Sequence, residues 1–124
     1  MINESLHIGE WIYSTLLQID NLSVFPVIAT EENEGNYAVY WRTSMSSSNT
    51  KDGINGDTLT INLNIYSQDY EESVSLMTTA RKLLCKGGRY NGMRICNFQI
   101  ITGSEDWAEN FFIQNITFTI DITN

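Results

Sequence analysis

The chain has 124 residues, of which 42% are hydrophobic and 18% charged, a composition that indicates one folded domain over residues 1–124. Seven basic residues against fifteen acidic ones give a net charge of −8, which argues against sequence-specific nucleic acid binding because phosphate contacts need clustered Lys and Arg. The N-terminus lacks the pattern of a signal peptide and no apolar run approaches the roughly 20 residues of a membrane span, so we expect a cytoplasmic protein without membrane contacts.

Residues 4–19 are the first predicted helix, because apolar residues recur there at a spacing of about four. His7, the only histidine, falls away from the apolar stripe, so we expect it at the surface. The residues predicted to form the stripe are Ile8, Ile12 and Leu16, widened by Leu6, Tyr13 and Leu17.

Extended segments follow this helix. Residues 23–28 predict a short strand, which Pro26 confines to an edge or to irregular pairing because proline has no backbone N–H. The acidic run 30–36 predicts a loop, and the aromatic and β-branched residues 37–43 predict a strand. Residues 44–56 are rich in Ser, Asn and Gly and predict a thirteen-residue polar loop, a length that is uncommon in compact domains unless the loop is functional.

Residues 57–66 alternate strictly between apolar and polar side chains, which predicts a strand buried on one face only. Its apolar face is Leu59, Ile61, Leu63 and Ile65, and its polar face is Thr58, Thr60, Asn62 and Asn64.

The second predicted helix covers residues 70–85. Asp69 stands at the N-cap position with Glu72 three residues on, and Gly87-Gly88 follows as a glycine C-cap. Its predicted buried stripe is Tyr70, Val74, Met77, Ala80 and Leu84, with Leu76 and Leu83 beside it.

The last third of the chain predicts a tight turn at 86–92, a strand at 93–102, a turn at 103–110 and a final strand at 111–123. The final strand alternates, with Phe112, Ile116, Phe118, Ile120 and Ile122 on one face and Asn115, Thr117, Thr119, Asp121 and Thr123 on the other. Together these elements predict an α+β two-layer sandwich, a mostly antiparallel sheet with two amphipathic helices packed on one face.

No pattern in the chain points to catalysis. Cys85 and Cys96 are expected as free thiols in a reducing cytosol, and with His7 they offer only three zinc ligands without C-x-x-C spacing. The glycine-rich run 86–92 follows a helix and opens a strand, the reverse of a phosphate loop. Residues 52–57 lack the bidentate Glu of a calcium loop. We therefore expect no catalytic residue, no metal and no cofactor.

A set of short segments, in chain order after the first helix, resembles a known family. The segments are Val24-Phe25-Pro26, Tyr37-Ala38-Val39-Tyr40 with the polar segment after it, Ser67-Gln68-Asp69-Tyr70-Glu71-Glu72-Ser73, Gly92-Met93-Arg94-Ile95, and Phe112-Ile113-Gln114-Asn115-Ile116-Thr117-Phe118-Thr119-Ile120. They resemble the tail-completion, or tail-terminator, proteins of long-tailed phages and prophages, and the resemblance covers most of the chain. Asn36 departs from the pattern, because family members often have proline there.

The resemblance implies a structural protein with no enzymatic activity and no cofactor. Such a subunit caps the finished tail tube, joins the tail to the head connector and assembles as a ring, commonly of six copies. The implied partners are copies of the chain itself, the tail-tube protein and the head-connector protein. The implied locations are the host cytoplasm during assembly and the tail of the virion. An acidic ring around a DNA channel would repel the duplex and let it slide.

Three segments are the candidate partner-binding surfaces: the polar faces of residues 58–66 and 113–123, which suit subunit contacts, and the polar segment 44–56, which suits contact with a neighbour. The candidate residues are Ser46, Ser48, Asn49, Lys51, Asp52, Asn55, Thr58, Thr60, Asn62, Thr117 and Thr119.

Two other classes of function stay open. One is a small non-enzymatic adaptor or ligand-binding domain of similar topology, which ring assembly and association with a tail-tube protein would exclude. The other is a small hydrolase or thiol enzyme built on Cys85 or Cys96, which would lose its activity when these thiols are alkylated.

Overall fold

In the part of the chain that the structure describes, six strands form one sheet in the order β1-β2-β3-β6-β5-β4. The protein is described by a computed structural model that covers residues 5–29, 35–49 and 55–123. β1 is parallel to β2 and every other pair of neighbours is antiparallel, so Pro26 lies on an edge strand as predicted. The strands are β1 Ser23–Pro26, β2 Tyr37–Asn49, β3 Asn55–Ser67, β4 Gly88–Tyr90, β5 Met93–Ala108 and β6 Phe111–Thr123.

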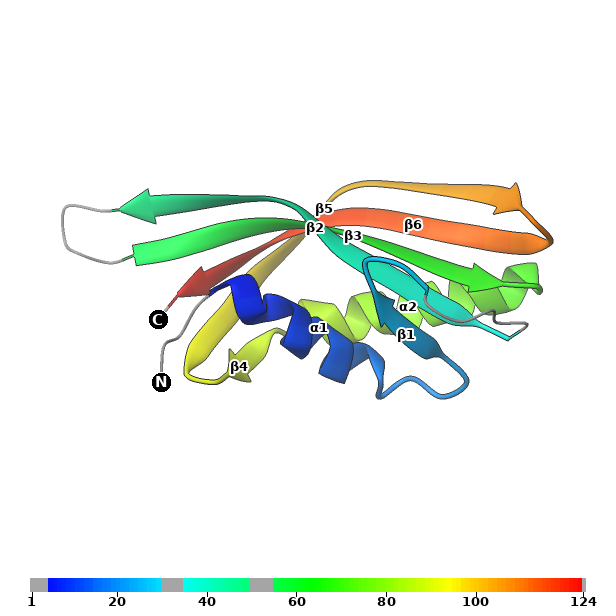
Figure 1. Ribbon diagram of the computed structural model, residues 1–124, viewed down its shortest axis with the longest axis horizontal. Coiled ribbons are helices and arrows are strands. Elements are labelled where there is room, and N and C mark those ends of the chain that lie inside the picture. The colour runs from blue at the N-terminus through cyan, green and yellow to red at the C-terminus, as the bar shows by residue number, and fades with distance from the viewer. Residues whose placement is uncertain (1–4, 30–34, 50–54, 124) are drawn as a thin grey trace.

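The helices pack on one face of this sheet (Figure 1). A short 3-10 helix, η1 Ser5–His7, leads into α1 Ile8–Leu16, and α2 Tyr70–Cys85 connects β3 to β4. This arrangement confirms the predicted α+β fold with a mostly antiparallel sheet. Over the parts of the chain that the structure describes, no helix has the length and apolar character needed to cross a membrane.

The core fills the space between the helices and the sheet. The predicted apolar face of β3 lies at its centre, and each of its four side chains is at most 1% exposed. Complete burial of a Leu or Ile side chain contributes roughly 1.5–3 kcal/mol, so the alternation of this strand is a main determinant of stability. The side chains that meet it include Ile8, Ile12 and Leu16 of α1, Ala80 and Leu84 of α2, and Phe118 and Ile120 of β6.

The buried stripe of α1 differs from the prediction along one edge. Ile8, Ile12 and Leu16 are buried as predicted, and Trp11 and Thr15 complete the stripe at the i+3 positions. Because the helix turns this side toward the sheet, its opposite edge faces outward. The residues predicted to widen the stripe are therefore exposed: Leu6, Tyr13 and Leu17.

The ends of α2 follow the prediction. The Asp69 side chain accepts a hydrogen bond from the backbone N–H of Glu72 at 2.9 Å, which caps the first turn. At the other end Gly87 has a φ of 60°, the left-handed conformation that stops a helix.

The prediction of the buried stripe of α2 is wrong at the start of the helix, where Tyr70 and Val74 are exposed and Ser73 is buried. The hydroxyl of Ser73 donates to the backbone oxygen of Tyr70 at 2.6 Å and accepts from the amide of Gln114 at 3.2 Å. These hydrogen bonds satisfy the hydroxyl, which makes its burial acceptable.

The predicted loop at 44–56 is largely wrong. β2 continues to Asn49 and β3 begins at Asn55, with Ser46 opposite Thr58 in the antiparallel ladder. The register shifts between Arg42 and Ser44, so a bulge lets the strand continue. The pairing of backbone groups across the ladder compensates for the weak strand propensity of Ser and Asn. Residues 50–54 lie outside the described residues.

The predicted turn at 103–110 is also wrong, because β5 continues to Ala108, opposite Phe111 of β6. The connection is only Glu109 and Asn110, with φ values of 52° and 71°. Positive φ at both positions identifies a tight two-residue hairpin turn. The turn predicted at 86–92 is confirmed only at its end, where Asn91 and Gly92 connect β4 to β5 in the same way, because Gly88–Tyr90 form strand β4.

Candidate partner-binding surfaces

The face of the sheet opposite the helices, here called the outer face, is predominantly polar along β3 and β6. The antiparallel register places Thr58 opposite Asp121, Thr60 opposite Thr119, and Asn62 opposite Thr117. The structure therefore brings five predicted partner-binding residues together on one surface: Thr58, Thr60, Asn62, Thr117 and Thr119.

Hydrogen bonds between side chains connect the strands across the outer face. Thr117 donates to Asn62 Oδ1 at 2.7 Å, and Asn115 donates to Asn64 Oδ1 at 2.6 Å. Thr58 donates to one carboxylate oxygen of Asp121 at 2.7 Å. Because these groups satisfy one another, the outer face is an ordered polar surface, and a partner that binds it must match groups that are already paired.

The other predicted residues are spread more widely. Ser46 is exposed on β2 beside Thr58, and Ser48, Asn49 and Asn55 belong to the same two paired strands. The remaining two predicted residues, Lys51 and Asp52, fall outside the described residues.

An aromatic cluster borders the outer face and was not predicted. The rings of Tyr37 and Tyr66 stack with centroids 4.3 Å apart, and Phe111 meets Tyr37 edge-on at 5.4 Å. Burial, followed by the neighbouring Tyr66 and Glu109, raises the pKa of Tyr37. These residues come from three separate strands, so no local pattern in the sequence connects them.

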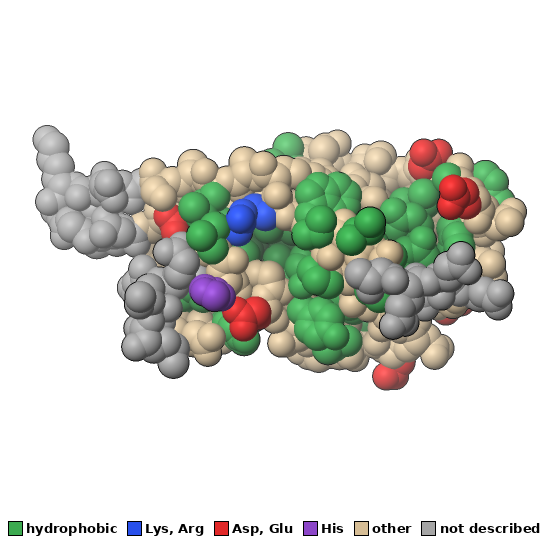
Figure 2. Space-filling view, in the orientation of Figure 1, with side chains coloured by type: hydrophobic (Ala, Val, Ile, Leu, Met, Phe, Trp, Pro, Cys, Tyr) green, Lys and Arg blue, Asp and Glu red, His purple; other side chains and the backbone are tan. Residues whose placement is uncertain are grey.

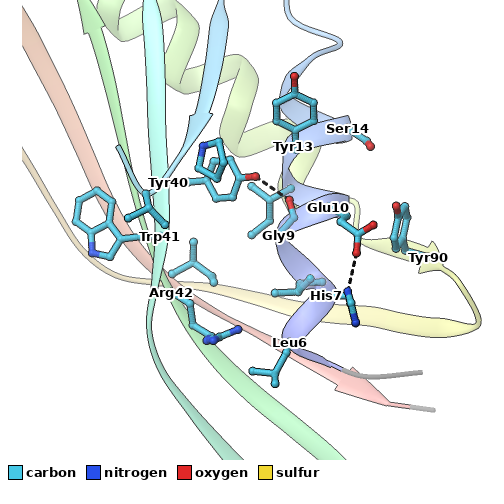
Figure 3. A pocket seen from close by; sticks show the side chains of 15 residues that line it. Leu6, His7, Gly9, Glu10, Tyr13, Ser14, Tyr40, Trp41, Arg42 and Tyr90 are labelled. Atoms are coloured by element: carbon cyan, nitrogen blue, oxygen red, sulfur yellow. Dashed lines mark hydrogen bonds and ion pairs between the residues drawn. The ribbon is translucent and has the colours of Figure 1, made fainter. Parts of the chain in front are cut away.

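A groove runs between α1 and β2, with the end of β1 at its border (Figure 3). It has a volume of about 770 Å³ and is here called the α1–β2 groove. Its wall includes the side chains that the prediction had placed in the core of α1, Leu6 and Tyr13, together with Val27, which is 71% exposed. Figure 2 shows apolar side chains gathered on this side of the molecule.

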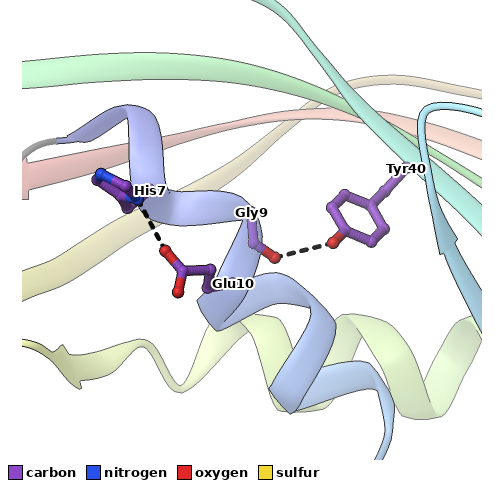
Figure 4. A network of polar contacts seen from close by, with 4 residues as sticks. All are labelled: His7, Gly9, Glu10 and Tyr40. Atoms are coloured by element: carbon purple, nitrogen blue, oxygen red, sulfur yellow. Dashed lines mark hydrogen bonds and ion pairs between the residues drawn. The ribbon is translucent and has the colours of Figure 1, made fainter.

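The polar groups of the groove are few and specifically placed. The hydroxyl of Tyr40 donates to the backbone oxygen of Gly9 at 2.9 Å and ties α1 to the sheet (Figure 4). His7 and Glu10 lie within 2.8 Å of each other on the exposed side of the helix, as expected for a surface histidine. Arg42 of β2 also lines the groove, and among the described residues it forms no ion pair.

The hairpin formed by residues 105–112, here called the β5–β6 hairpin end, carries exposed aromatic and acidic side chains. Trp107 is 52% exposed and packs against Phe112, with centroids 4.6 Å apart. Glu105 accepts hydrogen bonds from the hydroxyl of Tyr70 at 3.0 Å and from the amide of Gln114 at 3.0 Å. The hydrogen bond from Tyr70 to Glu105, together with the negative charge of Glu105, raises the pKa of Tyr70.

The thiols and the histidine lie in different places. Cys85 and Cys96 are free and line a small pocket with Lys86, whereas His7 lines the α1–β2 groove. Within the described ranges, no group of three His, Cys, Asp or Glu side chains is placed to hold a metal ion. The structure therefore does not bring a Cys-His pair together.

Comparison with known proteins gives matches among solved structures. No protein-family model matches the sequence, and no curated protein matches it. Among solved structures, a chain from a "virion of native gene transfer agent (GTA) particle" superposes with a TM-score of 0.71 at 10% identity. The superposition covers 91% of this chain and 92% of that chain, so the two share a fold over nearly their whole lengths.

Proposed function

We propose that this chain is a structural protein of a phage-like particle, a tail-completion subunit that caps the tail tube and joins it to the head connector as part of a ring. The observation that carries the proposal is the fold shared with the gene transfer agent chain, which extends over nearly all of both chains. The ordered motifs that resemble the tail-completion family support the same reading from the sequence.

The motif residues meet each other in the structure. Gln114, from the closing motif, reaches Ser73 from the helix-start motif at 3.2 Å and Glu105 at 3.0 Å. Tyr40, from the tyrosine motif, binds the backbone of α1. The motifs therefore mark contacts that hold the fold, which supports the resemblance at the level of architecture.

The surfaces of the molecule suit contacts with other proteins. The outer face is broad and polar, and we assign it to contact with the tail-tube protein. The net charge of −8 disfavours binding to DNA, as expected for a subunit that surrounds a passage for the duplex. A structural role of this kind needs neither catalysis nor a cofactor.

A ligand-binding domain is the second candidate, because the α1–β2 groove favours it. Its volume of about 770 Å³ falls within the range of small-molecule sites, roughly 300–1,000 Å³, and its wall is largely apolar. A protein of this class would bind a small molecule and would not associate with a tail tube.

The proposal is tested with the purified chain and the tail-tube protein encoded beside it. Light scattering of the chain alone, and then with tubes, gives its mass, and negative-stain images show where it binds. We expect ring-sized assemblies at one end of the tubes. A chain that sediments separately from the tubes, with no density at their ends, would contradict the proposal and leave the ligand-binding class as the alternative.

A further inference from the structure

The α1–β2 groove and the β5–β6 hairpin end are two exposed surfaces at different places on one molecule. Figure 1 shows the turn between β5 and β6 at one end of the long axis and the start of α1 in the other half. We propose that they form a single contact between copies of the chain, in which the hairpin end of one copy docks in the groove of the next. This inference rests on the proposed ring-forming function.

The two surfaces have matching apolar parts. The groove exposes Leu6 at 50% and Val27 at 71%, and the hairpin end exposes Trp107 at 52%. An aromatic side chain that enters such a groove removes a large apolar area from water, which is the usual anchor of a protein interface.

Arg42 of the groove is opposite in charge to the hairpin end. The carboxylate of Glu10 lies 2.8 Å from the His7 ring, whereas Arg42 forms no ion pair with any described residue. The hairpin end carries Asp106 and Glu109 beyond Glu105, whose oxygens already accept two hydrogen bonds within the molecule. In a chain with only seven basic residues, an arginine that forms no ion pair with the described part of the chain and lies beside an apolar groove favours an acidic occupant.

A second copy is the occupant that these observations favour. The chain itself supplies an acidic, aromatic end that complements an apolar groove with Arg42 in its wall. Because the two surfaces differ, their contact is heterologous, and repeated contacts close into a ring when the rotation fits. A contact of this kind gives assemblies of more than two copies, whereas a symmetric contact stops at a dimer.

Charge reversal at each surface tests the inference. The full chain is analysed by sedimentation as wild type, Arg42→Glu, Glu109→Lys and the double variant. We expect wild type to exceed two copies of its 14.1 kDa mass. Each single variant should raise the apparent dissociation constant at least tenfold, because like charges then face each other. The double variant should recover self-association, since its reversed charges attract.

Two controls separate a local effect from a general effect of charge or misfolding. Arg81→Glu and Asp20→Lys alter exposed residues outside both surfaces and should leave the mass distribution unchanged. Circular dichroism of every variant confirms the fold. If Glu109→Lys unfolds, Asp106→Lys provides the second reversal on the same hairpin.

Several outcomes would overturn the inference: a wild-type chain that stays monomeric or stops at a dimer, single variants that assemble like wild type, or a double variant that stays dissociated. A monomer whose groove binds the apolar dye anilinonaphthalene sulfonate would point to a small-molecule site. Tube binding by the same variants separates the two proposals. Self-association through these surfaces without tube binding contradicts the proposed function alone, and tube binding unaffected by the reversals contradicts this inference alone.

Discussion

Tyr40 shows how one side chain joins the two layers of the fold and forms part of the groove. It is 5% exposed, and its hydroxyl donates to the backbone oxygen of Gly9 in α1. Burial, followed by the nearby Tyr13, raises the pKa of Tyr40 from its ordinary 10 to about 12. The folded protein therefore favours the neutral phenol, the form that can donate this hydrogen bond.

We expect Tyr40→Phe to lower the free energy of unfolding by about 1 kcal/mol at neutral pH, the usual contribution of one hydrogen bond. The raised pKa also predicts a pH dependence. The stabilisation is complete below about pH 10 and is lost as the pH rises through about 12, because the unfolded chain releases this proton first. Urea unfolding between pH 8 and pH 12 should show a steeper loss for wild type than for the variant.

Tyr13→Phe is the control for this pair, since Tyr13 is 39% exposed and its loss leaves the Tyr40 hydrogen bond in place. The control should keep most of the alkaline loss of wild type, because burial, the larger cause of the raised Tyr40 pKa, is unchanged when the smaller effect of Tyr13 is removed. Equal slopes for wild type and Tyr40→Phe would mean that this hydroxyl is not coupled to folding.

At the scale of elements, the junction between α2 and β4 depends on one glycine. A Cβ atom on Gly87 would lie 2.3 Å from the backbone oxygen of Ile95, and the residue has a φ of 60°. We expect Gly87→Ala to lower the free energy of unfolding by more than about 2 kcal/mol, because left-handed strain adds roughly 1–2 kcal/mol to a clash with backbone. Gly35→Ala is the matched control, since its Cβ would meet nothing within 4 Å. Thermal unfolding of both variants tests this prediction, and equal melting temperatures would contradict it.

How much of the fold the sequence could predict depends on the range of the interactions. The Asp69 cap, the Gly87 stop and the buried face of β3 depend on residues close together in the chain, so local patterns predicted them. The far ends of β2 and β5 could not be predicted in this way. Ser46 and Trp107 are in strands because their backbones pair with Thr58 and Phe112.

The candidate surfaces also differ in how far local sequence patterns could predict them. Alternation predicted the polar outer face, since every second residue of β3 and β6 shares one side. The α1–β2 groove is formed by residues from separate elements, and its wall includes Leu6 and Tyr13, which periodicity assigned to the core. Both residues are compatible with an apolar stripe, and only the packing of α1 against the sheet decides which edge faces outward.

At the scale of the whole molecule, the outer face and the groove should serve different contacts. Thr119 lies opposite Thr60 on the outer face, and its side chain makes no hydrogen bond to any described residue. We expect Thr119→Lys to fold, because a long lysine can extend its charge into water. The projecting side chain should prevent close approach of a partner to the outer face, which would lower binding to tail tubes at least tenfold.

Self-association should remain within twofold of wild type in this variant, because the groove and the hairpin end are unchanged. Ser75→Lys, an exposed substitution on α2 in the helical layer, is the control and should bind tubes normally. Co-sedimentation with tubes and sedimentation of the chain alone measure the two contacts separately. If Thr119→Lys dissociates the copies, they meet through the outer face and not through the groove. If it binds tubes like wild type, the tube contacts another surface.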